Sequence, residues 1–153
     1  MTAPVQEPSQ GRTDQAQEWK TRQLFRRPAP QRTAQFDIKV ISDTAVLATG
    51  DGQFIFAIPS DLNGTNLTSA QAYVTTVSSS GTPTVQIRNV TQTADMLSTK
   101  ITIDVSEFTS YTAAVPSVVD TANDDVATGD LIAIDVDVAG TGAKGLGIIL
   151  DFG

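Results

Sequence analysis

Apolar and polar residues alternate along several short stretches of the chain, which is the pattern of half-buried β-strands. The clearest stretch runs from Leu97 to Val105, where Ile101 and Ile103 continue the apolar series between polar neighbours. A strand produces this period of two because successive side chains point to opposite faces of the sheet. The same alternation predicts six further strands. They cover residues 36–40, 54–58, 70–77, 84–88, 132–138 and 146–152.

Turn-forming residues separate the predicted strands. They are Asp51–Gly52, Asn63–Gly64, residues 78–81 and residues 140–142. Seven or eight short strands with such turns predict an all-β fold, a single β-sandwich or jelly roll with one face of each sheet buried. We expect only two helical segments. One is a short turn from Thr93 to Met96, and the other lies between Asp14 and Arg27, where Pro28 ends it.

The first 35 residues differ from the rest of the chain. They contain four prolines and seven glutamines, and their large apolar residues are Val5, Trp19, Leu24 and Phe25 alone. Four such residues are too few to close a core, so residues 1–35 are predicted to form an extended or disordered N-terminal arm. Residues 36–153 are rich in threonine, valine and isoleucine, which favour strands, and we assign the β-sandwich domain to them.

Charge is divided between the same two parts. The arm carries six basic and three acidic residues, whereas residues 36–153 carry four basic and fourteen acidic ones. The acidic body argues against nucleic-acid binding, because phosphate recognition needs a basic surface. The basic arm suits an acidic protein surface, including the body of a neighbouring copy.

Several residue types are absent. The chain has no cysteine and no histidine, which removes disulfides, thiolate metal sites and the commonest general base. No apolar run approaches the roughly 18–20 residues of a membrane span, and the first 30 residues contain no secretion signal. We therefore expect a protein that is not an enzyme, needs no metal or other cofactor, has no membrane segment and is made in a cytoplasm.

Two loops invite a chemical interpretation. The carboxylates between Asp120 and Asp130 are of the type that binds calcium, but their spacing lacks the alternation of a known calcium loop. We interpret this segment as a solvated acidic turn. The segment Gly140–Gly145 contains a lysine, Lys144, yet no helix follows it as a phosphate-binding loop requires. A glycine-rich β-turn is the better interpretation.

A pair of carboxylates occupies one predicted strand. Asp135 and Asp137 are two residues apart and so share a face, and Asp104 would lie near them if its strand pairs alongside. Paired carboxylates can hydrolyse glycosides, but the body offers few aromatics to line a sugar cleft, with Tyr73 and Tyr111 the best candidates. We expect these aspartates to lie on a solvated surface, where arginines from another chain's arm could meet them.

The arm contains the most suggestive cluster in the chain. Tryptophan and arginine dominate the energetics of protein interfaces, and large apolar residues in a segment unable to fold alone call for a partner surface. We predict that this cluster binds another subunit. Its members are Trp19, Arg22, Leu24, Phe25, Arg26 and Arg27.

Five segments of the body resemble a β-sandwich module of tailed-bacteriophage virion proteins. They are residues 58–64, 83–91, 95–97, 101–104 and 129–137, and residues 139–146 continue the likeness. The resemblance covers about two thirds of the chain, from Phe54 to Phe152. It implies a capsid decoration (cement) protein or a fibre-type appendage, usually trimeric. The arm lacks the heptads of a fibre stalk, which favours the decoration protein.

Our leading hypothesis is a phage capsid decoration protein on the virion surface. Its partners would be the major capsid protein and neighbouring copies of itself in a homotrimer, without nucleic acid or membrane. The alternative is a fibre or tail-associated adhesin that binds host glycan with the sandwich loops, which rests on fold analogy. A glycosidase that uses Asp135 and Asp137 is a third and remote hypothesis.

Overall fold

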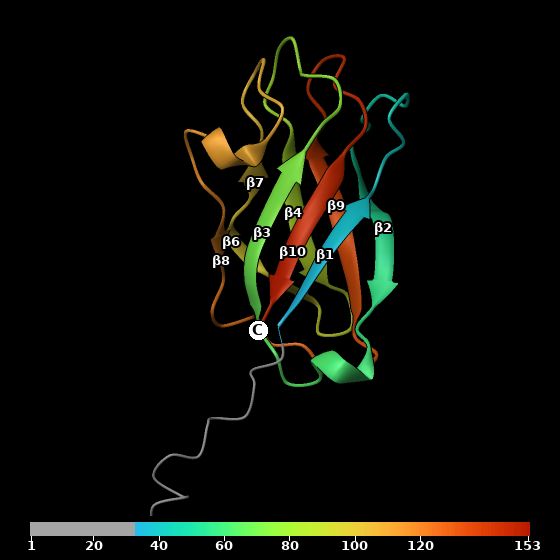
Figure 1. The fold of residues 1–153 in the computed structure, drawn as a ribbon, viewed down its shortest axis with the longest axis vertical. Helices are drawn as coiled ribbons and strands as arrows, with labels where there is room; N and C mark the ends of the chain where they lie inside the picture. The colour runs from blue at the N-terminus through green and yellow to red at the C-terminus, as the bar shows by residue number, and fades with distance from the viewer. Residues whose placement is uncertain (1–32) are drawn as a thin grey trace, which may run out of the picture. The chain divides into compact units, whose positions relative to one another are not determined.

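The computed structural model describes residues 33–153, which form two main antiparallel sheets packed face to face (Figure 1). The first sheet has the order β1 (Ala34–Lys39), β10 (Gly147–Phe152), β3 (Leu67–Tyr73). The second has the order β2 (Gly50–Ala57), β9 (Leu131–Val138), β4 (Thr84–Asn89), β5 (Ala94–Asp95), and β7 (Ile101–Thr102) also pairs with β4. A small third sheet joins β6 (Leu97–Thr99) to β8 (Val118–Val119). The predicted all-β sandwich is confirmed.

The chain crosses between the two main sheets several times. β1 and β3 belong to the first sheet, whereas β2 and β4 belong to the second, and β9 and β10 are again on opposite sheets. The inward-facing side chains of both sheets therefore share one core. Ile87, Ile134 and Leu150 are fully buried in it, as the alternation predicts.

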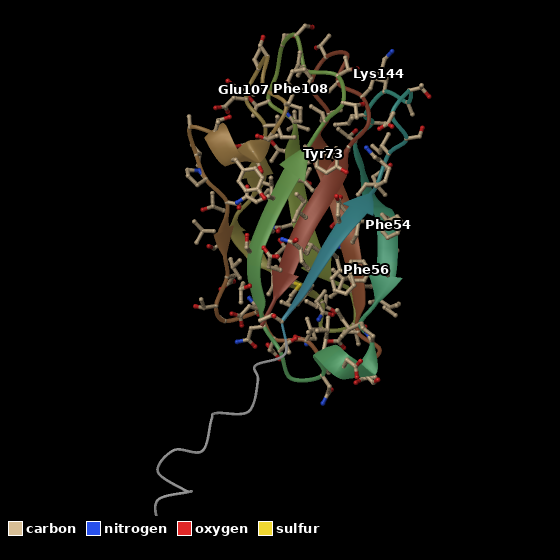
Figure 2. The ribbon with its side chains drawn as sticks, viewed as in Figure 1. Phe54, Phe56, Tyr73, Glu107, Phe108 and Lys144 are labelled. Atoms are coloured by element: carbon tan, nitrogen blue, oxygen red, sulfur yellow. The ribbon has the colours of Figure 1, made fainter. Side chains whose placement is uncertain are left out.

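Three phenylalanines connect the sheets on the side where the edge strands β1 and β2 lie. The Phe36 ring lies 5.7 Å from the Phe56 ring and 5.8 Å from that of Phe152, in an edge-on arrangement with the latter. Figure 2 shows Phe54 and Phe56 along β2 on this side of the sandwich. Phe36, Phe54, Phe56 and Phe152 lie on the apolar faces of predicted strands, and all four pack in or against the core.

The predicted strand from Leu97 to Val105 is interrupted. It is divided into β6 and β7, which pair with different strands, and Lys100 stands between them. Ile103 is buried, but Val105 lies beyond the strand and is 42 % exposed. The apolar residues Leu97, Ile101 and Ile103 are nevertheless buried on both sides of the break.

Two further local predictions were wrong. The expected helical turn at Thr93–Met96 is a hairpin instead, with Thr93 in the left-handed region (φ 57°) and Ala94–Asp95 forming β5. The Asp51–Gly52 turn signal lies inside β2, where the register shifts between Gly50 and Phe54 and Gly52 has φ 62°. A positive φ suits glycine in a bulge as well as in a turn, so the dipeptide alone could not distinguish them.

The described chain begins and ends at the same end of the sandwich. Ala34 pairs with Phe152, and Asn66 and Gly153 exchange two backbone hydrogen bonds of 3.0 Å. Two short 3₁₀ turns, η1 (Ser60–Leu62) and η2 (Ser110–Thr112), are the helical elements of residues 33–153. No helix within this range is long and apolar enough to cross a membrane.

Candidate functional site

A group of exposed apolar side chains lies on the segment that runs from beyond β7 to the first residue of β8. Nine large apolar residues of the described chain are exposed, and five of them fall between residues 105 and 118. We call these five the apolar strip. They are Val105 (42 % exposed), Phe108 (56 %), Tyr111 (65 %), Val115 (56 %) and Val118 (50 %). Such grouping marks interaction surfaces, because single exposed apolar residues are ordinarily scattered.

The first half of this segment is fixed to the end of β3. The backbone N–H of Val74 donates to the carbonyl of Phe108 over 2.8 Å, and Tyr73 and Thr109 form an isolated antiparallel bridge. Ser110 is buried at the start of η2, where its hydroxyl accepts from the Ala72 N–H over 2.8 Å. Phe108 is therefore held in place by its backbone while its side chain faces water (Figure 2).

The second half is fixed as well. Asp104 accepts a 2.8 Å hydrogen bond from the Ala114 N–H, and the Thr102 hydroxyl donates to the Val115 carbonyl over 3.2 Å. Ser117 donates to the Ala70 carbonyl over 2.7 Å, which ties the segment to β3 near the middle of that strand. The apolar strip is thus a preformed surface that runs along the edge of the sandwich beside β3.

Because the strip faces water, it contributes little to folding. We expect Phe108→Ser and Tyr111→Ser each to change the free energy of unfolding by less than about 0.5 kcal/mol, as surface substitutions usually do. Urea denaturation followed by circular dichroism would measure this. A loss above about 2 kcal/mol for either variant would mean that the side chain belongs to the core of a folded assembly already present in solution.

Along the sequence, the segment that carries the strip has acidic and no basic residues. Asp104 and Glu107 precede Phe108, and no lysine or arginine occurs between Lys100 and Lys144. Figure 2 shows Glu107 beside Phe108 at the end of the sandwich where several loops meet. The surface therefore combines apolar contact area with negative charge.

Three of the four basic residues of the body are engaged in ion pairs with its own aspartates. These pairs are Lys39–Asp43 (2.7 Å), Arg88–Asp135 (2.6 Å) and Lys100–Asp137 (2.7 Å). Four basic residues cannot neutralise the fourteen acidic residues of residues 36–153. A basic partner would find the body attractive at long range.

The predicted pair Asp135 and Asp137 is not a solvated catalytic pair. Asp135 is only 4 % exposed, and its carboxylate accepts from Arg88 and from the Gly52 N–H. Asp137 is exposed and pairs with Lys100. Asp104 is not beside them, because its carboxylate accepts from Ala114 in the segment after β7. The expectation of a solvated surface was wrong for Asp135, which is buried, and each of the two carboxylates is paired with a basic residue of this chain.

The acidic loop 120–130 is also not uniformly solvated. Asp120 stays in its own turn, accepting from the Ala122 N–H over 3.0 Å and from the Asn123 amide over 2.8 Å. Asp130 is buried. One of its oxygens accepts from Asn89 (2.9 Å), Gln92 (2.9 Å) and the Ala127 N–H (3.0 Å). These carboxylates do not converge, and no group of three potential metal ligands occurs in residues 33–153.

The buried carboxylate of Asp130 gives the fold an acid sensitivity. The hydrogen bond from Asn89 leads the causes that hold the pKa of Asp130 below its ordinary value of 3.8. A lowered folded-state pKa stabilises the native state above pH 3.8, and this contribution is lost as the pH falls through the folded-state pKa. We expect Asp130→Asn to flatten the acid limb of stability against pH, measured by denaturant unfolding. An unchanged slope would contradict this.

The Tyr73 side chain already contacts two residues of β1, a strand of the same sheet. Its hydroxyl donates to Asp37 over 3.0 Å, and the Nζ of Lys39 lies 4.8 Å from the centroid of its ring. Burial, followed by the hydrogen bond to Asp37, raises the pKa of Tyr73. The ring face that a sugar would stack on is shared with a lysine, so Tyr73 is a poorer glycan candidate than the sequence suggested. Tyr111 remains open.

The predicted partner-binding cluster of the arm lies outside the described residues. Its members are Trp19, Arg22, Leu24, Phe25, Arg26 and Arg27. Tyr111 was predicted from the sequence as a candidate for contact with a sugar, whereas the other four residues of the apolar strip were not predicted. A signal was present: residues 105–118 contain large apolar residues without the alternation that would bury them in a sheet.

Comparison with known proteins found no matching family model, no similar curated protein and no similar solved structure. The resemblance to a phage virion module therefore remains a prediction from the sequence.

Proposed function

We propose that this protein is a structural component of a tailed-bacteriophage virion, a capsid decoration (cement) protein. It binds the major capsid protein as a homotrimer, and its N-terminal arm spreads over the capsid protein or an adjacent subunit. The apolar strip is the observation that carries this proposal. A segment held by hydrogen bonds that keeps five large apolar side chains in water is suited to association with protein.

The distribution of charge supports the same proposal. The arm has a basic excess and the body an acidic one, so copies attract one another through unlike parts while their bodies repel. On a shell with many sites, the arm and the body would bind together, and the second contact would benefit from the effective concentration that the first creates. Decoration of a capsid therefore needs no single strong contact.

The test uses the full chain with the three apolar side chains of the arm cluster replaced by alanine. Trp19→Ala, Leu24→Ala and Phe25→Ala together should abolish binding of labelled protein to purified phage heads, while the circular dichroism spectrum stays unchanged. Val5→Ala is the matched control, because it shortens an apolar side chain elsewhere in the arm and should bind normally. Normal occupancy by the triple variant would refute the role of the arm.

A second candidate function is glycan binding by an adhesin. Tyr111 and Phe108 favour it, because both are exposed aromatics three residues apart, and Phe108 lies near one end of the sandwich (Figure 2). A sugar would stack on such rings and hydrogen bond to nearby carboxylates such as Glu107. A glycan array would decide: hits that Tyr111→Ala removes would favour the adhesin, and an array without hits would count against it.

A further inference from the structure

We propose that the apolar strip is the docking site for the arm segment Trp19–Arg27 of a neighbouring copy of this chain. This inference rests on the proposed function, because it names the partner of the same surface. The contact would link adjacent copies on a shell, each body receiving the arm of the next. Such head-to-tail contacts are directional, so they can close a ring such as a trimer or continue from one trimer to another.

The two surfaces match in apolar content. The arm segment offers Trp19, Leu24 and Phe25 as large apolar side chains. The strip offers Phe108 and Tyr111 as exposed rings, with three valines beside them. Aromatic residues meeting across an interface contribute disproportionately to binding, because they bury much area with few rotatable bonds.

They also match in charge. Between Trp19 and Arg27 the arm has four basic residues, Lys20, Arg22, Arg26 and Arg27, and no acidic one. Residues 101–119, which include the apolar strip, contain two acidic residues, Asp104 and Glu107, and no basic one. The arm therefore meets no like charge from this segment.

The strip is ready to bind without rearrangement. Backbone bonds from Val74 to Phe108, and side-chain bonds from Ser117 to Ala70, hold it in its observed form. Binding therefore orders only the arm, at roughly 1–2 kcal/mol per residue of backbone freedom. A preformed partner surface reduces the total cost of association.

The length of the arm allows it to reach the strip of its own body as well as that of a neighbour. Thr33 lies beside Gly153 and Thr68, at the start of β3, whereas Phe108 is bonded to Val74 just beyond its end. Six residue steps lead from Thr68 to Val74, a length of roughly 20 Å. The eight peptide units from Phe25 to Thr33 span roughly 28 Å at full extension. We assign the docked arm to a neighbouring copy because the proposed function requires contacts between copies, and mixing two variants tests this assignment.

Trp19 gives a direct readout, because it is the one tryptophan of the chain. In the full chain, its fluorescence emission should shift to shorter wavelength and resist quenching by acrylamide as protein concentration rises. Phe108→Ser with Tyr111→Ser should return the emission to that of a water-exposed indole. Val46→Ser is the matched control, since Val46 is 56 % exposed like Phe108 but lies outside the strip, and it should leave the shift intact.

Mixing two variants identifies the copy that supplies the arm. The first carries Trp19 and the serine-substituted strip, and the second carries Trp19→Phe and an intact strip. Docking on a neighbour predicts that adding the second restores the blue shift of the first in a concentration-dependent way. The proposal would be overturned if the mixture failed to restore the blue shift. It would also be overturned if the serine substitutions left the Trp19 emission of the full chain unchanged.

The fluorescence experiment needs no phage particle, so its outcome is separate from that of the proposed function. If the protein never binds phage heads but the mixture restores the shift, the docking stands and the decoration role fails. If the protein decorates heads but the serine substitutions in the strip do not change the Trp19 emission, the decoration role stands and this docking site is wrong.

Discussion

Replacing Arg88 with methionine is expected to lower the free energy of unfolding by about 3 kcal/mol, the lower end of the range for breaking a buried ion pair. Asp135 is 4 % exposed, and its carboxylate accepts from Arg88 Nε over 2.6 Å and from Nη2 over 3.1 Å. The methionine side chain has a volume similar to that of arginine but carries no hydrogen-bond donor and no charge. Asp135 would keep the Gly52 N–H as a donor and would remain a buried charge without a cation.

The neighbouring ion pair provides the control. Lys100 and Asp137 are 2.7 Å apart, but their side chains are 45 % and 32 % exposed. Lys100→Met should therefore cost less than about 1 kcal/mol, as exposed pairs do. Urea unfolding of both variants at neutral pH would compare them. Equal losses would contradict the claim that burial of Asp135, and not ion pairing as such, sets the size of the effect.

The burial of Asp135 shows where the sequence pattern stops being informative. Alternation placed Asp135 correctly on the face opposite Ile134, and that face was expected to be wet. The sheet order puts β9 between β2 and β4, so Arg88 from one side and the bulge at Gly52 from the other cover the carboxylate. Alternation reports which residues share a face, but strand order decides what lies beside them.

The strands themselves were largely predictable. β1, β2, β4, β9 and β10 lie where the alternation put them, because each carries apolar residues on one face to a common core. The failures occurred where the chain changes sheets or ends a strand. Val105 and Val138 continue an apolar series, yet both are 42 % exposed because they lie at the margin of the sandwich.

The candidate site was less predictable than the fold. The segment 105–118 is held in place by contacts with β3, which is distant from it in sequence, and with residues 102–104, which directly precede it. A sequence without period-two alternation shows only that no ordinary strand is present. Whether Phe108 faces the core or water depends on Val74 and Ser110, whose hydrogen bonds orient the backbone.

Phe152→Ala is expected to lower the free energy of unfolding by about 3–5 kcal/mol, the usual cost of removing a buried aromatic side chain. Phe152 is 1 % exposed, and its ring packs edge-on against Phe36. Directly after it, Gly153 and Asn66 exchange two backbone hydrogen bonds, which hold β10 in the sandwich as far as Phe152.

Phe108→Ala is the matched control for that substitution, because it removes the same atoms from a side chain that is 56 % exposed. We expect it to change stability by less than about 0.5 kcal/mol. Denaturant unfolding of both variants would separate the two roles of phenylalanine in this protein. Phe152 on β10 packs against Phe36 on β1 and so stabilises the pairing of the first and last strands of the sandwich. Comparable losses for the two variants would mean that Phe108 is buried in solution, which would remove the apolar strip as a free docking surface.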